Sequence, residues 1–115
     1  MSRAASVSVR RAAETALVFA ALGDETRLQL LSRLCHEGPL SIARLSEGAD
    51  ITRQAITKHL GTLETSGLLE AERQGRERVY QVTPARFQAA RRYLEQVSAQ
   101  WDDVIDRLRA HVEEQ

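Results

Sequence analysis

Apolar residues recur at helical spacing along the last third of the chain. They follow one another at alternating offsets of three and four, as Phe87, Ala90, Leu94, Val97, Trp101, Val104 and Leu108. Residues at these offsets share one face of an α-helix. Thr83 and Pro84 precede the run, and a capping hydroxyl followed by proline is typical of a helix start. The pattern predicts a helix over residues 84–113 that is roughly 45 Å long at 1.5 Å per residue.

The predicted C-terminal helix is too long to be covered by so small a domain. Its heptad-like seam therefore predicts packing against a second copy of itself, with residues 13–22 of a first helix completing the interface. Trp101 is the expected anchor, because a large aromatic side chain near a seam dominates interface energy. The alternative is that the stripe only covers the core of its own subunit. The candidate dimer-interface residues are Leu17, Phe87, Leu94, Val97, Trp101, Val104 and Leu108.

A second helical pattern lies within residues 51–67. Its inward stripe consists of Ile56, Leu60 and Leu63, at offsets of four and three, and Thr52 can cap the helix start. The outer face is left with Arg53, Gln54, Thr57 and Lys58. Arginine and lysine donate to guanine acceptors or phosphate, glutamine pairs with adenine, and threonine bonds a phosphate or touches a thymine methyl. A solvated surface helix would have the same pattern, so the flanking segments decide between the two interpretations.

The flanking segments predict a winged helix-turn-helix. Upstream, Ser41 can cap a short helix over residues 42–47, and Gly48-Ala49-Asp50 forms a tight break, so residues 41–66 read as helix, turn, helix. Downstream, Gly67 ends the second helix. Apolar and polar residues then alternate over residues 69–82, which predicts two short strands around a turn at Gln74-Gly75. The expected fold is mainly α with a small β-hairpin wing.

Three arginines cluster at the tip of the predicted hairpin: Arg73, Arg76 and Arg78. Guanidinium groups in this position suit a DNA backbone or minor groove. The alternative is that charged edge strands discourage aggregation, with Glu72 and Glu77 neutralising the arginines. His59 either contacts a phosphate or lines the buried edge beside Ile56. The candidate DNA-binding residues are Ser41, Thr52, Arg53, Gln54, Thr57, Lys58, His59, Arg73, Arg76 and Arg78.

Three sequence blocks in this order resemble the ArsR/SmtB family of winged-helix bacterial repressors. They are ALGDETRLQLLSRL from Ala21, LSIARLSEGADITRQAITKHLGTLETSGLL from Leu40, and RQGRERVYQVTP from Arg73, and the resemblance covers about Phe19 to Pro84. It implies a homodimeric repressor that inserts one recognition helix per subunit into successive major grooves of an inverted repeat, with wings on the flanking DNA. The chain departs from the family pattern at Asp50, where the family usually has glycine, and at Gly61, where it often has a polar residue.

The metal sites that the resemblance suggests are incomplete in this sequence. Many family members bind metals through paired cysteines in the first helix of the helix-turn-helix, but residues 40–45 contain none. Others hold zinc between C-terminal helices; His111 and Glu114 would supply one half, whereas Ser98 and Gln100 occupy the other half and are not zinc ligands at that spacing. Relatives that sense reactive sulfur need two cysteines, and Cys35 stands alone. We therefore expect no metal and no cofactor.

Cys35 ends a predicted helix over residues 24–35 that turns Leu28, Leu31 and Leu34 inward, and we expect its thiol to be buried. Residues 1–7 are small and polar enough to form a loose arm before a single winged-helix domain over residues 8–115.

Composition fits one small domain and leaves the DNA-binding preference to the arrangement of charges. The chain has 115 residues, 43% of them apolar, and a net charge of zero. Residues 52–83 carry five basic and four acidic groups. Any positively charged surface must therefore arise from the local arrangement of basic side chains. The chain has no stretch of eighteen apolar residues to span a membrane, and a lone cysteine fits a reducing compartment, so we expect a cytoplasmic protein.

Three functions remain open from the sequence. The first is a metal-independent DNA-binding repressor, the second a repressor that responds to a small molecule or to redox change through an unseen effector site, and the third a winged-helix module that binds protein. The polar outer face of residues 53–58 favours DNA, since a protein-binding face would usually expose aromatic or aliphatic side chains. An enzyme is not expected, because the sequence has no nucleophile–base pair, metal set or phosphate loop.

Overall fold

The computed structural model describes residues 3–114 and consists of five helices and three strands within that range. The helices are α1 (Arg3–Leu22), α2 (Glu25–Glu37), α3 (Ile42–Ser46), α4 (Arg53–Thr65) and α5 (Pro84–Glu113). The strands are β1 (Leu40–Ser41), β2 (Leu69–Gln74) and β3 (Glu77–Val82). This is the mainly helical winged helix-turn-helix fold with a long C-terminal helix that the sequence predicts.

The three strands form an antiparallel sheet in the order β1-β3-β2. β2 and β3 form the wing, in which Gln74 pairs with Glu77, so the hairpin turn consists of Gly75 and Arg76. The predicted turn at Gln74-Gly75 is therefore wrong by one residue. Gly75 has a φ of 64° while Arg76 does not have a positive φ, and glycine at the first loop position is what a type II′ turn requires. The geometry of the turn fixes the pairing register of β2 and β3. The alternation of apolar and polar residues does not specify that geometry.

The hydrophobic core lies where α2, α3, α4 and the sheet meet, and it is completed by Val18 and Ala21 of α1 and Ala90 of α5. Its most deeply buried members are Leu45, Ile56, Leu60, Leu63, Leu68 and Val18, all less than 2% exposed or close to it. Leu60 and Leu63 come from the stripe predicted for the recognition helix. The core therefore fixes which face of α4 turns outward.

Helix α2 buries a different face from the predicted one. Leu30, Leu31 and Leu34 are in the core, whereas Leu28 is 49% exposed. Cys35 is also exposed, so the expected buried thiol is wrong. Both errors have one cause: the inward face of α2 keeps Leu31 and Leu34 but is turned toward Leu30 and away from Leu28 and Cys35.

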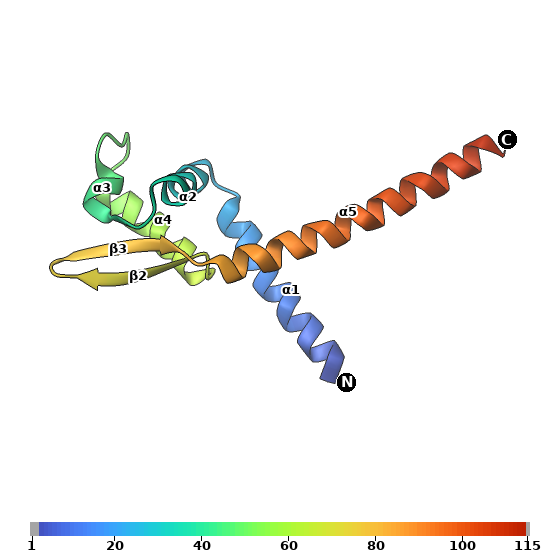
Figure 1. Ribbon diagram of the computed structural model, residues 1–115, viewed down its shortest axis with the longest axis horizontal. Coiled ribbons are helices and arrows are strands. Elements are labelled where there is room, and N and C mark those ends of the chain that lie inside the picture. Colours follow the sequence, from blue (N-terminus) through green and yellow to red (C-terminus); the bar gives the residue numbers. More distant parts are fainter. Residues whose placement is uncertain (1–2, 115) are drawn as a thin grey trace.

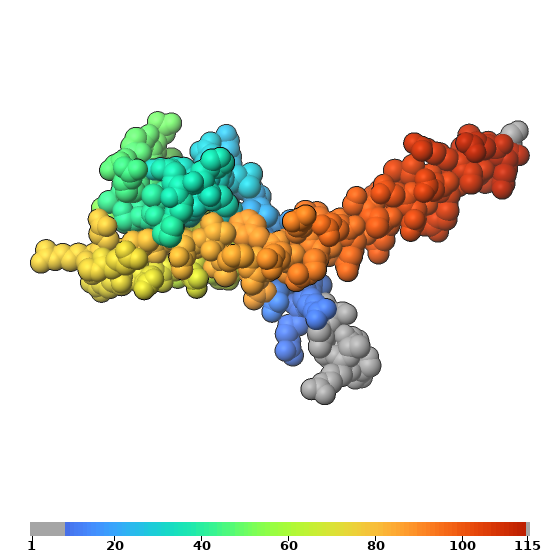
Figure 2. All heavy atoms as spheres, in the orientation of Figure 1, coloured from blue at the N-terminus to red at the C-terminus, as the bar shows by residue number. Residues whose placement is uncertain are grey.

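Helix α5 projects far beyond the winged core, and α1 crosses it near its start (Figure 1). The molecule measures 67 × 37 × 21 Å and has a radius of gyration of 19.1 Å, compared with roughly 13 Å for a compact domain of this length. In the space-filling view the second half of α5 is a bare rod (Figure 2). Helix α1 begins at Arg3, so residues 3–7 are helical instead of the expected loose arm; residues 1 and 2 lie outside the described range.

The predicted seam of α5 divides into two parts. Near the start of the helix, Ala90 is 6% exposed and Phe87 packs against the core of its own subunit. Further along, the large apolar side chains are exposed: Leu94, Trp101, Ile105, Leu108 and Val112. The first turns of α5 therefore follow the alternative interpretation, in which the stripe covers the core of its own subunit. Phe87 belongs to this part, because it packs against that core.

Candidate nucleic-acid interface

The recognition helix α4 starts where the sequence places its cap. The Thr52 hydroxyl oxygen accepts a hydrogen bond from the Ala55 backbone N–H at 3.0 Å, which satisfies one of the donors left unpaired at a helix start. Because Ile56, Leu60 and Leu63 are 1% exposed or less, the orientation of the opposite face is fixed by packing.

The outward face of α4 consists of exposed polar side chains at its N-terminal end. Arg53, Gln54, Thr57 and Lys58 are all exposed. The Thr57 hydroxyl donates its proton to the Arg53 carbonyl oxygen at 2.8 Å, so its methyl group and the acceptor lone pairs of the oxygen are left to contact a ligand. Two cations, one amide and one methyl group on two turns of a rigid helix match the donors and apolar contacts used to read the major groove.

The first helix of the motif, α3, is held by α2 and by its own cap. Arg33 of α2 donates to the carbonyl oxygens of Arg44 at 3.2 Å and Leu45 at 3.4 Å, which pairs two acceptors at the end of α3. Arg33 also donates to the Glu37 carboxylate at 2.8 Å, and this hydrogen bond lowers the pKa of Glu37 below its ordinary value.

The structure places Ser41 as the cap of α3. Its hydroxyl oxygen accepts from the Arg44 backbone N–H at 3.2 Å, and the residue is 9% exposed and paired with Val79 of β3. The break between α3 and α4 relies on Gly48, which has a φ of 68°, and Asp50 does not have a positive φ. Although Asp50 stands where the family usually has glycine, Gly48 supplies the left-handed backbone angles of the turn.

His59 turns from the outer face of α4 toward α2. Its Nδ1 lies 3.2 Å from Arg27 Nη1 and 3.9 Å from Asp24 Oδ1, and its side chain is 25% exposed. Of the two predicted roles for His59, these contacts favour the partly buried edge of α4. The Arg27 side chain also donates to the carbonyl oxygens of Ala21 at 2.6 Å and Ala20 at 3.3 Å.

The Arg27 guanidinium therefore connects the end of α1 to the recognition helix. Asp24 completes this cluster by capping α2, because its carboxylate accepts from the Arg27 backbone N–H at 3.0 Å. That hydrogen bond, aided by the charges of Arg27 and His59, lowers the pKa of Asp24. Sequence reasoning missed Arg27 because His59 is 32 residues away along the chain.

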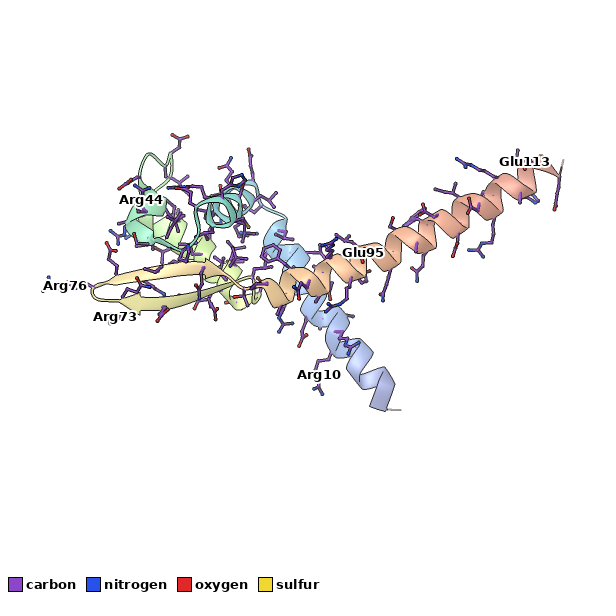
Figure 3. The ribbon with its side chains drawn as sticks, in the orientation of Figure 1. Arg10, Arg44, Arg73, Arg76, Glu95 and Glu113 are labelled. Carbon is purple, nitrogen blue, oxygen red and sulfur yellow. The ribbon has the colours of Figure 1, made fainter. Side chains whose placement is uncertain are left out.

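The wing carries its arginines beside α4, at the end of the hairpin. Arg73 pairs with Arg78 across the strands, and these two share the sheet face of Tyr80 because side chains alternate along a strand. Arg78 donates to the Glu64 carboxylate of α4 at 3.1 and 3.2 Å and lies 5.7 Å from the Tyr80 ring centroid. Arg73 and Arg76 lie at the tip (Figure 3).

Charges on the wing are sorted by face. Alternation places Glu70 and Glu72 on the face opposite Arg73 and Arg78, so the acids do not cancel the bases on the side toward α4. Arg78 already donates hydrogen bonds to the Glu64 carboxylate. Arg73 and Arg76 are therefore more available than Arg78 for phosphate contacts. A net charge of zero is therefore compatible with a local basic surface.

In the described residues, 3–114, no helix is long and apolar enough to cross a membrane, and no three His, Cys, Asp or Glu side chains within that range group as a metal site would require.

Known proteins that are similar to this chain are helix-turn-helix transcriptional regulators. A helix-turn-helix domain model matches residues 22–72. The chain is 37% identical over 75 residues to the HTH-type transcriptional regulator Rv2034 of Mycobacterium tuberculosis, covering 65% of this chain and 69% of that protein. It is 36% identical over 67 residues to the arsenical resistance operon repressor of Escherichia coli, covering 58% of this chain and 57% of that protein.

Solved structures agree with the sequence relatives. An ArsR-like transcriptional regulator from Rhodococcus sp. RHA1 superposes with a TM-score of 0.73 at 40% identity, covering 84% of this chain and 90% of that chain. A crystal structure of the ArsR family transcriptional regulator RHA00566 superposes with a TM-score of 0.71 at 30% identity, covering 77% and 91%. With the winged helix-turn-helix geometry and these matches together, the chain belongs to the ArsR/SmtB family of DNA-binding transcriptional regulators.

Proposed function

We propose that the protein is a homodimeric repressor that binds an inverted-repeat operator through α4 and the wing, without a metal ion. The observation that carries this proposal is the outward face of α4, where Arg53, Gln54, Thr57 and Lys58 are all exposed on a helix whose opposite face is locked in the core. Rigid placement matters, because base readout requires donors held in register with the groove. A role as a repressor is supported by the similarity to the arsenical resistance operon repressor of Escherichia coli.

The second subunit in this proposal covers the exposed stripe of α5. Trp101 is 63% exposed and Leu108 is 59% exposed, and an apolar hollow of about 300 Å³ lies beside Ile105, Leu108 and Val112. A second copy of the same helix fits this stripe because the heptad-like spacing is self-complementary about a twofold axis. Leu17 of α1 is 53% exposed and belongs to the proposed interface as a second exposed apolar contact. Two subunits would present two α4 helices to half-sites about one DNA turn apart.

Metal independence is supported by the donor groups. The only cysteine, Cys35, lies at the end of α2 and outside the helix-turn-helix, and Ser98 and Gln100 stand where the family's C-terminal zinc site would need ligands. Added zinc should therefore leave operator affinity unaltered. The exposed face of α4 also lacks the aromatic and aliphatic side chains typical of a protein-binding module, which favours DNA over the protein-interaction alternative.

The deciding experiment measures DNA affinity after the operator has been identified by unbiased selection from genomic DNA. In a fluorescence-anisotropy titration, Arg53→Ala/Lys58→Ala should weaken binding at least roughly 30-fold, because each base or phosphate contact contributes on the order of 1–3 kcal/mol. The matched control is Arg91→Ala/Arg107→Ala, which removes the same charge from α5, remote from α4. Unchanged affinity of the α4 double variant, or equal loss in the control, contradicts the proposed DNA-binding face.

A further inference from the structure

A groove between α1 and α5 gathers three arginines away from the DNA-binding face. It has a volume of about 470 Å³ and is lined by Arg11, Glu14, Thr15, Arg86, Ala89, Arg92, Tyr93 and Gln96. This volume falls in the range of small-molecule sites. Three guanidinium groups against one carboxylate give the lining a net charge of plus two in a chain whose total is zero.

The wall of the groove is organised by Arg86. Its Nη1 donates to the Glu14 carboxylate at 2.7 Å, so the only acid in the lining is already engaged. The side-chain stem of Arg86 lies over Gly67: a Cβ added to that glycine would stand 2.8 Å from Arg86 Cγ. Tyr93 is anchored separately, with its ring 5.9 Å from that of Phe19. Two lining residues are therefore held in place before any ligand arrives.

The remaining two arginines have no such partner. In the part of the chain that the structure describes, neither Arg11 nor Arg92 has a carboxylate within 4.0 Å. Like charges in one groove repel each other, and an anion with two or more charges would remove that repulsion while accepting several charge-assisted hydrogen bonds. Thr15, Tyr93 and Gln96 add uncharged donors.

We propose that this groove binds a small organic anion carrying at least two negative charges, either a phosphate ester or a polycarboxylate. The site lies on a different face of α5 from the exposed stripe: Arg92 and Gln96 are offset from Leu94 and Trp101 by more than a quarter turn at 100° per residue. On α5 the groove is therefore separate from the exposed stripe, whereas Glu14 and Thr15 belong to the segment of α1 that is expected to complete the dimer interface.

The groove is also placed to affect the recognition helix. Gly67 follows α4, with a φ of 84°, and Arg86 packs on it while pairing with Glu14 of α1. An anion in the groove competes with Glu14 for Arg86 and so loosens a contact between α1, α5 and the end of α4. This consequence rests on the proposed function, because it makes the anion an effector of DNA binding.

Calorimetric titration of the full chain tests the site without DNA. Inorganic phosphate and citrate serve as probes, each against chloride at equal ionic strength. Binding of phosphate alone indicates a phosphate ester, and binding of citrate alone or of both indicates that carboxylates are accepted. Arg11→Ala and Arg92→Ala should each weaken binding about tenfold, since each removes charge-assisted hydrogen bonds. Arg91→Ala is the matched control, because Arg91 pairs with Glu95 on its own helix, 3.1 Å away, and does not line the groove.

Three results would overturn the proposed site: no binding of either probe, equal weakening in Arg91→Ala, or loss of self-association in Arg92→Ala without any anion binding. The last would mean that the arginines meet carboxylates of a second subunit. A parallel anisotropy titration at constant ionic strength tests the coupling. The bound anion should lower operator affinity in the wild type but not in Arg92→Ala. Absence of DNA binding without any anion would instead refute the proposed function, while the calorimetric result stands separately.

Discussion

The winged core and the distal half of α5 have similar apolar patterns but opposite surroundings. Leu60 and Leu63 of α4 are 0% exposed, whereas Trp101 and Leu108 of α5 are 63% and 59% exposed. Both stripes follow the same offsets of three and four along the sequence. Periodicity therefore determines that a helix forms and which face is apolar, but it does not say which surface covers that face.

The difference predicts two kinds of stability. Burial within the subunit stabilises the winged core at any protein concentration, by roughly 25 cal/mol per Å² of apolar surface removed from water. The distal half of α5 gains little from its own subunit, so its stripe stabilises the structure only when a second copy is bound. Mutations in the buried stripe of α4 should destabilise the core, and mutations in the exposed stripe of α5 should separate the subunits.

The largest expected effect comes from a matched pair of truncations, Leu60→Ala and Trp101→Ala. Leu60→Ala leaves a cavity among fully buried side chains and should lower the free energy of unfolding by about 2–5 kcal/mol. Trp101→Ala should leave the core folded and weaken dimerisation by about 2 kcal/mol, a roughly 30-fold change in the dissociation constant. Urea unfolding followed by circular dichroism measures the first, and sedimentation equilibrium measures the second.

The comparison breaks if the two variants behave alike. A wild type that sediments as a monomer at every concentration would refute the second subunit, and Trp101 would then be an exposed aromatic without a partner. A Trp101→Ala variant that unfolds as readily as Leu60→Ala would show that the distal half of α5 contributes to the core of its own subunit.

Local patterns predicted most of the fold and the outer face of the site. The cap at Thr52, the buried stripe of α4 and the arginines of the wing depend on residues within a few positions of one another, so sequence spacing reveals them. The stripe of α2 was misplaced because its inward face includes Arg27, three residues before Leu30, and a partly buried arginine does not resemble a core position.

The connections between elements were not visible in the sequence. The Arg27–His59 contact and the Glu14–Arg86 pair join residues that are 32 and 72 positions apart. Neither involves a periodic pattern, and both depend on how helices cross after the core has formed. His59 is a further example. Its position on α4 could be predicted from the sequence, but the orientation of its side chain depends on contacts with Arg27 of α2 and with Asp24.

An intermediate effect is expected at Arg27, which joins the core to α1. Arg27→Ala removes a hydrogen bond from a charged donor to the Ala21 carbonyl together with the contact to His59, and should lower the free energy of unfolding by about 1–2 kcal/mol. Arg27→Lys should not restore it, because one ammonium group cannot reproduce the forked geometry of a guanidinium. Operator affinity should fall as well, through the displaced α4. Urea unfolding and anisotropy measure both, with Arg91→Ala as the control for charge.

The smallest expected effect is a pH dependence at Asp24. The hydrogen bond from the Arg27 backbone N–H, which outweighs partial desolvation, lowers the pKa of this carboxyl in the folded state. A lowered folded-state pKa means that the ionised cap stabilises the protein fully above the unfolded-state pKa and loses that contribution as pH falls through the folded-state value. Asp24→Asn keeps a side chain that caps helices well but does not ionise. The stability difference between wild type and Asp24→Asn, measured by urea unfolding across the acid range, should therefore be largest near neutral pH and shrink with acidification. A difference that stays constant with pH would show that Asp24 acts through its cap geometry alone and that its charge contributes nothing to the contact with Arg27 and His59.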